Sequence, residues 1–467
     1  MSTTAQPDDL PPRLGLASAV AVLVGSTIGS GIFRVPAEVA RDVGDTWLYL
    51  LVWVAGGILA LAGALTYSEL AAMYPKSGGI YVFLREAFGR PVAFLFSWAM
   101  LVVIRPAALG AISSTSASYT LRCFGFDPHT ELGPIQAEQA LGAVYIVLVM
   151  TVNYVGVHHA ALLQNFSTIL KVGALVVLVL AGFAFGEAVA TTAGATEATG
   201  GFTGFFAALI PVMWAYDGWA DVSFIGGEVR NPQKTLPRAL FLGTALIITV
   251  YLAANFVYLH LFSIGGEGVL KGIGQSFRMG LGGRELVAAD VLQLLVGPIG
   301  VVLISVTVAV STFGTLNGTM MTSPRIFFAA ARDGLFPKAI ATVHPIAKTP
   351  TRAILLTASL GVIYVMVRTF SELADQFVVG LFPFYALAVA AVYVLRKRLP
   401  DAPRAYKTWG YPIVPALFLI GALLMLGNYL FTDTLKFMVN IGVVLLGLPV
   451  YWAWRIEQRV RGLEKGP

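Results

Sequence analysis

The stretch Gly25-Ser26-Thr27-Ile28-Gly29-Ser30-Gly31-Ile32-Phe33 interrupts the first apolar segment of the chain. Its glycines let a helix unwind at low steric cost. A helix that restarts near Gly31 presents free N–H groups at the positive end of its dipole, which favours an anion. The carbonyls left unpaired by unwinding can accept hydrogen bonds from an ammonium group. The stretch therefore suits the two ends of a small zwitterion; the alternative is that its small residues only allow close helix packing.

A second interruption, Trp214-Ala215-Tyr216-Asp217-Gly218-Trp219, lies in the sixth apolar segment. Breaks in the first and sixth helices of a ten-helix core indicate a transporter built from two inverted repeats, with its site at the bilayer midplane. Non-helical backbone at that depth must be surrounded by protein or water. The matching break favours a binding site over simple packing.

The composition excludes a soluble protein. Of the 467 residues, 57% are apolar and only 12% are charged, and the mean hydropathy is +0.78. A helix needs ~20 apolar residues to cross a bilayer. The apolar stretches therefore predict an all-α integral membrane protein with twelve transmembrane helices, near residues 14–40, 47–73, 91–120, 138–157, 165–186, 203–229, 238–262, 287–323, 352–368, 376–396, 412–431 and 437–455.

Three regions follow from this pattern. We expect residues 1–13, which are polar and rich in proline, to form a disordered cytoplasmic tail and not a signal peptide. Residues 14–398 would form the ten-helix transport core, and residues 399–467 helices 11 and 12 with a short cytoplasmic tail.

The net charge is +6, and Lys and Arg cluster in the loops between apolar segments. This distribution is typical of membrane topology and gives no reason to expect a nucleic-acid partner. More Lys and Arg lie in the loops on the side of the two termini than in the loops on the opposite side, so we expect both termini in the cytoplasm. We expect the protein in the inner (plasma) membrane of the cell. Cys123 is the single cysteine, and the five histidines lack metal-ligand spacing. We therefore expect no metal, no cofactor, no catalytic residues and no enzyme activity.

Several motifs, in order along the chain, carry a resemblance to a known family: Ser30-Gly31-Ile32-Phe33, Tyr67-Ser68-Glu69-Leu70, Pro75-Lys76-Ser77-Gly78-Gly79, Arg105-Pro106, Glu228-Val229-Arg230-Asn231-Pro232, Asn317-Gly318, Ser323-Pro324-Arg325 and Ala331-Arg332-Asp333-Gly334. With them the chain resembles the amino acid–polyamine–organocation superfamily, and within it the L-type amino acid transporter family. The resemblance implies two inverted five-helix repeats with helices 1 and 6 broken, and alternating-access exchange or uniport of L-amino acids.

The resemblance also implies a set of substrate-binding residues, from both breaks: Ser26, Thr27, Ile28, Ser30, Gly31, Trp214, Ala215 and Asp217. One departure is Ala220, where animal members often have asparagine. Animal members also use a cysteine to bond a heavy-chain partner, but Cys123 lacks the expected surroundings. We expect no disulfide-linked heavy chain.

Lys171 lies inside the fifth predicted helix, where a charge costs ~2.5–3.5 kcal/mol at the centre. On sequence alone it could also reach the membrane interface. The resemblance implies a fixed ammonium that replaces the cation of sodium-coupled relatives and touches helix 1 and helix 8. The polar face of helix 8 would be Ser311, Thr312, Thr315 and Asn317.

Two further groups of charges have weaker assignments. Glu228 is one candidate partner for Arg105, and solvation in the inner vestibule is the other reading. Glu69 with Lys76, Arg85 and Arg90 is expected to form a solvated cytoplasmic face without chemistry.

The sequence thus predicts a sodium-independent transporter of mainly neutral L-amino acids, with cationic ones as a secondary class. The alternatives are a proton-coupled amino acid symporter of the same fold, and a transporter of cationic amino acids or polyamines. A channel would not require two broken helices at repeat-related places.

Overall fold

The computed structural model describes residues 14–75, 78–155, 157–185, 201–262, 269–272, 275–278, 286–337, 340 and 351–460. The predicted tail, residues 1–13, lies outside them. The first half of the chain forms α1 (Leu16–Thr27), α2 (Gly31–Val43), α3 (Thr46–Met73), α4 (Ile80–Phe88), α5 (Arg90–Ala99), the π-helix η1 (Met100–Ile104), α6 (Arg105–Cys123), the hairpin β1 (Glu131–Leu132) and β2 (Ile135–Gln136), α7 (Ala137–Val155) and α8 (Val157–Phe185).

The described residues of the second half also form helices, together with the hairpin of β3 (Val269–Gly272) and β4 (Gln275–Arg278). They form α9 (Gly201–Tyr216), the 3-10 helix η2 (Trp219–Glu228), α10 (Pro232–Leu261), β3, β4, α11 (Val287–Val296), α12 (Pro298–Arg332), α13 (Thr351–Val367), α14 (Phe370–Arg398), α15 (Ile413–Thr432), α16 (Thr434–Leu445) and α17 (Gly447–Val460).

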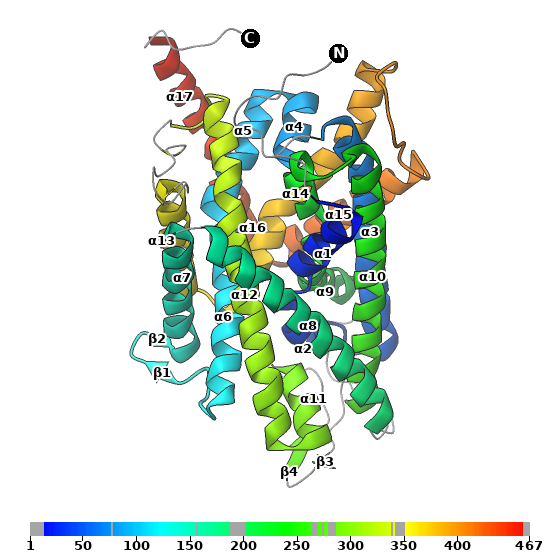
Figure 1. Cartoon of the computed structure of the whole chain (residues 1–467), viewed down its shortest axis with the longest axis vertical. Helices are drawn as coiled ribbons and strands as arrows, with labels where there is room; N and C mark the ends of the chain where they lie inside the picture. The colour runs from blue at the N-terminus through cyan, green and yellow to red at the C-terminus, as the bar shows by residue number, and fades with distance from the viewer. Residues whose placement is uncertain are drawn as a thin grey trace.

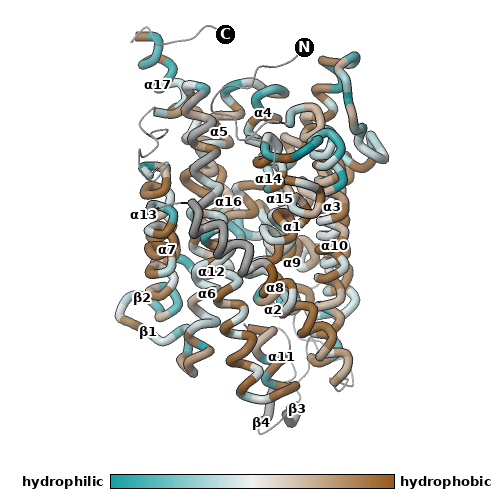
Figure 2. The backbone as a smooth tube through the Cα atoms, viewed as in Figure 1, coloured by the Kyte–Doolittle hydropathy of each residue, from teal (hydrophilic) through white to brown (hydrophobic). Residues whose placement is uncertain are grey.

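The long helices run along the long axis of the molecule, and α8 crosses them obliquely (Figure 1). Apolar residues cover much of their length (Figure 2). Within the described residues, eight helices are long and apolar enough to span a membrane, or nine if the bent pair α1 and α2 forms one span. The chain is therefore a helical, multi-pass membrane protein, whereas the count of twelve spans and the inverted repeats stay predictions.

Both predicted breaks are present. The axes of α1 and α2 differ by 46° across Ile28–Ser30. The second break follows Tyr216, where Gly218 has a φ of 113° that favours glycine, and the chain continues as the 3-10 helix η2. The predicted span 203–229 is thus divided at the place where its sequence carries Asp217-Gly218.

A proline explains how α2 contributes polar groups beyond its first turn. Pro36 has no N–H, so the carbonyl of Ile32, one turn earlier, loses its helical partner. The hydroxyl of Tyr258 in α10 donates to this carbonyl over 3.3 Å. Tyr119 in α6 likewise donates to the carbonyl of Phe33, over 3.0 Å. Side chains of neighbouring helices therefore satisfy the backbone around the first break.

The expectation of a solvated Glu69 is wrong. Glu69 is fully buried near the end of α3. Arg396 donates to its two oxygens over 3.0 and 2.6 Å, and Arg404 adds a bond of 3.1 Å. The backbone N–H and the hydroxyl of Thr408 each donate over 2.8 Å. The chain after α14 folds back over the end of α3, so this carboxylate joins three distant segments.

The other members of that predicted face have different surroundings. Arg85 is partly exposed and pairs with Asp333 over 2.7 Å and with Glu86 over 2.9 Å. Lys76 lies outside the described residues. Arg85 and Asp333 come from α4 and the end of α12, so they tie the two halves of the chain together on this side.

We expect Glu69→Gln to lower the free energy of unfolding by about 3–5 kcal/mol, because it leaves Arg396 and Arg404 without their buried counter-charge. Thermal or denaturant unfolding of the purified protein in detergent measures the change. Glu86→Gln is the matched control, since Glu86 pairs at the surface and its loss should cost at most about 1 kcal/mol. Equal stability of the two variants would contradict the structural role of Glu69.

Candidate functional site

A cavity of about 50 Å3 lies between the two breaks. Six of the residues predicted to bind substrate line it: Ser26, Thr27, Ser30, Gly31, Trp214 and Asp217. Gly218, Asp221, Arg105, Thr315, Thr319 and Phe377 are also among its lining residues. The structure thus brings the two interrupted segments, almost two hundred residues apart in the sequence, around one small space.

The two breaks are in direct backbone contact. A Cβ atom on Gly31 would lie 2.4 Å from the Cα of Ala215, and a Cβ on Gly218 would lie 2.7 Å from the backbone N of Thr27. Neither position can hold a side chain without moving its neighbour. The two glycines therefore set the distance between the half-helices, and with it the size of the cavity.

Tyr251 of α10 binds both breaks at once. Its hydroxyl lies 3.0 Å from the carbonyl oxygen of Thr27 and 3.1 Å from that of Ala215. Both carbonyls belong to the last turn of a helix that stops early, so they lack helical partners. The single buried hydroxyl of Tyr251 thus serves the backbone carbonyls at the ends of both α1 and α9 and holds these helix ends together.

Two predicted residues pack behind the cavity instead of lining it. Ala215 faces Gly31, and the only side chain that fits there is a small one. Ile28 is buried at the C-terminal cap of α1, where its N–H donates to the carbonyl of Val24 over 2.9 Å. Both residues shape the breaks without reaching the space between them.

Trp214 covers one side of the cavity. Its indole N–H donates to the hydroxyl of Ser30 over 3.3 Å, which joins the two breaks through side chains. Its ring meets Phe377 edge-on at 4.9 Å and Phe370 at 6.2 Å between centroids. Both phenylalanines belong to α14, so an aromatic cluster from two elements closes the site on this side.

Two carboxylates of the second break face the cavity. Asp217 accepts a 2.6 Å hydrogen bond from the hydroxyl of Tyr385 in α14. Asp221 lies 3.9 Å from the guanidinium of Arg105 and is hydrogen-bonded to Ser26. Asp217 is among the residues predicted from the sequence, whereas Asp221 is not, although its spacing of four residues from Asp217 was a signal that both could share a face.

The suggested pairing of Arg105 with Glu228 is wrong, because Asp221 is the carboxylate beside Arg105. Glu228 lies at the end of η2, and its backbone carbonyl accepts the N–H of Leu14. Arg105 is buried, and its Nε has no hydrogen-bond partner within the part of the chain that the structure describes. It thus supplies a positive group at the wall of the cavity.

Lys171 of α8 is fully buried. Its ammonium donates to the carbonyl of Gly25 in α1 and, over 3.2 Å, to the hydroxyl of Thr315 in α12. Ser311 and Thr312, in the same helix as Thr315, are also buried. The hydroxyl of Thr315 donates to the carbonyl of Ser311, and that of Thr312 donates to the carbonyl of Val308. The ammonium of Lys171 therefore joins α8 to α12 and to the last turn of α1, next to the first break.

Among the described residues, no group of three or more His, Cys, Asp or Glu side chains could hold a metal ion. The cavity is lined by hydroxyls, two carboxylates, one guanidinium and the N-terminus of α2, whose first N–H groups have no helical partner four residues earlier. These groups can bind the charged ends of a small molecule.

The model of the family described as "Amino acid permease" matches residues 14–449. The chain belongs to this family. It is a member of the amino acid–polyamine–organocation superfamily, and the permease match includes both breaks, Lys171 and Arg105.

Named relatives cover almost the whole permease. The serine/threonine exchanger of Bacillus subtilis is 33% identical over 96% of this chain and 97% of its own length. The large neutral amino acids transporter small subunit 2 of mouse is 31% identical over 95% of this chain and 81% of its own length. The b(0,+)-type amino acid transporter 1 of mouse is 29% identical over 98% and 93%.

We expect Gly31→Val to abolish transport, because a branched side chain at this position must push Ala215 away and separate the breaks. Gly173→Val is the matched control: it lies in α8, where an added Cβ meets nothing within 4 Å. Uptake into proteoliposomes measures the effect, and size-exclusion chromatography checks that both variants stay folded. Uptake by Gly31→Val at the wild-type rate would contradict this view of the breaks.

Proposed function

We propose that this permease is a sodium-independent transporter of L-amino acids that works by alternating access, as an exchanger or a uniporter. Its main substrates are neutral amino acids, and cationic ones form a secondary class. It lies in the plasma membrane with both termini in the cytoplasm, and its core consists of two inverted five-helix repeats followed by helices 11 and 12. It requires neither a cofactor nor a heavy-chain partner.

The observation that carries the proposal is the cavity between the two breaks. The N-terminus of α2 offers the N–H groups of its first turn and the positive end of a dipole to a carboxylate. The carboxylates of Asp217 and Asp221, together with backbone carbonyls near the ends of α1 and α9, suit an ammonium group. These complementary ends lie within one cavity of about 50 Å3, which favours a small substrate.

The position of Lys171 supports independence from sodium. Its ammonium binds a carbonyl of α1 and a hydroxyl of α12, which are oxygen ligands of the kind that a sodium ion would use. A covalently attached positive charge occupies this place in every cycle. No sodium ion is then needed to complete the site.

The names of the relatives guide the choice of substrates to test. They include a serine/threonine exchanger, a transporter of large neutral amino acids and a b(0,+)-type transporter. We propose uptake of labelled L-serine into proteoliposomes, competed with each of the twenty amino acids. Competition by several neutral L-amino acids supports the proposal, and uptake unaffected by any of them would overturn it.

A proton-coupled symporter is the second candidate, because Asp217 and Asp221 are carboxylates at the cavity wall that could carry a proton. Uptake into vesicles that contain no amino acid separates the two. A proton symporter accumulates labelled substrate there when an inward proton gradient is imposed, whereas an exchanger or a uniporter does not.

We expect Lys171→Gln to reduce initial uptake by about tenfold or more. The ammonium donates two hydrogen bonds, and a hydrogen bond to a charged group is worth roughly 1.5–3 kcal/mol. Lys436→Gln, which removes a surface lysine paired with Asp433, should transport normally. Replacing external sodium with choline should leave wild-type uptake unchanged. If choline halves uptake, the role assigned to Lys171 is wrong.

Asp217 provides a test of side-chain preference. If it contacts a cationic side chain, Asp217→Asn should weaken inhibition by arginine much more than inhibition by alanine or leucine, because an amide cannot neutralise a guanidinium. Tyr385→Phe is the companion variant, since it removes the hydrogen bond to Asp217 but keeps the charge. Equal losses for arginine and leucine would mean that Asp217 only braces the break.

A further inference from the structure

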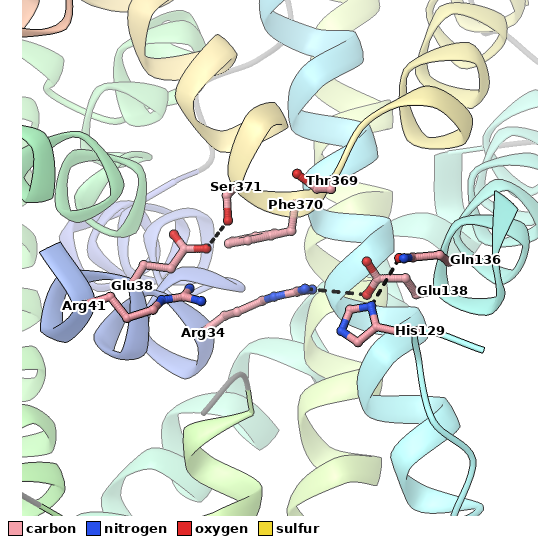
Figure 3. A pocket seen from close by; sticks show the side chains of 9 residues that line it. All are labelled: Arg34, Glu38, Arg41, His129, Gln136, Glu138, Thr369, Phe370 and Ser371. Atoms are coloured by element: carbon pink, nitrogen blue, oxygen red, sulfur yellow. Dashed lines mark hydrogen bonds and ion pairs between the residues drawn. The ribbon is translucent and has the colours of Figure 1, made fainter. Parts of the chain in front are cut away.

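A second and larger cavity, of about 230 Å3, lies between α2, the β1–β2 hairpin and the start of α14 (Figure 3). Arg34, Glu38 and Arg41 reach into it from one face of α2, at spacings of four and three residues. His129 and Glu138 approach from the opposite side, and Phe370 and Ser371 belong to the first turn of α14. No part of the proposed transport site lines this space.

A buried ion pair between Arg34 and Glu138 forms the floor of the cavity. Arg34 lies 3.5 Å from Glu138, and their side chains are only 8% and 2% exposed. Arg34 also donates to the hydroxyls of Ser114 and Ser118, and Ser118 donates to Glu138. Burying such a pair gives little net stability, because desolvation of both charges offsets their attraction. The pair therefore fixes the position of two charges at the floor of the cavity more than it stabilises the fold.

The mouth of the cavity presents a second pair of opposite charges. Arg41 is exposed, and Glu38 is hydrogen-bonded to Ser371 at the start of α14. Figure 3 shows the carboxylate of Glu38 directed toward Ser371 and the guanidinium of Arg34 directed toward Glu138. The lining therefore holds two guanidinium groups and two carboxylates, with equal positive and negative charge. This balance disfavours a bare metal cation or a phosphate and suits a molecule that carries one charge of each sign.

We propose that this cavity is a second binding site for an α-amino acid zwitterion, outside the transport site. The carboxylate binds Arg41, the exposed guanidinium of the lining, and the ammonium binds Glu38. This inference rests on the proposed function, because it assigns the site to the same class of substrate. We name the site the outer site.

One aromatic ring separates the outer site from the transport cavity. Phe370 lines the outer site, where the guanidinium of Arg34 lies 4.5 Å from the centre of its ring. The same ring packs edge-on against Trp214, which lines the transport cavity. An amino acid in the outer site thus waits directly beyond the aromatic cluster that covers the transport cavity, and it can enter when Trp214 and Phe370 separate.

Equilibrium binding to the full-length protein in detergent tests the outer site, with radiolabelled L-serine, L-leucine and L-arginine as three separate probes. We expect the wild type to bind two equivalents of at least one probe. Arg41→Gln and Glu38→Gln should each weaken binding of one equivalent by about tenfold or more and leave the other unchanged. Arg41→Lys should restore part of the loss. Lys397→Gln removes an exposed cation in the last turn of α14, at the opposite end of that helix from Ser371, and should bind like the wild type.

The outcomes separate this inference from the proposed function. A wild type that binds one equivalent, with Arg41→Gln and Glu38→Gln binding equally tightly, would overturn the outer site and leave the transport site standing. A wild type that binds none of the three probes, and whose uptake no amino acid inhibits, would overturn both. Two variants are used because either one could disturb the start of α14.

Discussion

The contact between the two helix breaks is the constraint on which the rest of the structure depends. Gly31 touches Ala215, and Gly218 touches the backbone of Thr27, at distances that exclude any side chain on either glycine. These contacts bring the N-terminus of α2 and the carboxylates of the second break to one cavity. They also expose backbone groups that a membrane cannot solvate, so the surrounding helices must supply polar partners.

Those partners come from residues that are otherwise buried in an apolar core. The hydroxyl of Tyr251 binds the carbonyls of Thr27 and Ala215, and the ammonium of Lys171 binds that of Gly25. Each of these groups connects the first break to another helix. A change of conformation at the breaks would alter contacts with α8, α10 and α12, as the proposed alternating-access mechanism requires.

The sequence predicted the parts of the site that depend on local chemistry. The glycines in both breaks predict where the helices end. Six of the eight residues predicted to bind substrate line the cavity. Long-range partners were beyond its reach. Glu69 was assigned to a solvated face because its partner Arg396 lies 327 residues later, and Arg105 was matched with Glu228 because nothing local distinguishes that residue from Asp221. Tyr385 and Phe377 were missed for the same reason, since only folding brings α14 to the break.

The most direct test of the account is a cryo-electron microscopy structure of the protein saturated with an L-amino acid that it transports. We predict density for the substrate between the two breaks, with its carboxylate at the N–H groups that begin α2 and its ammonium toward the ends of α1 and α9. Bound substrate elsewhere, with the cavity between Ser26 and Asp217 empty, would contradict the central claim that the paired breaks form the transport site.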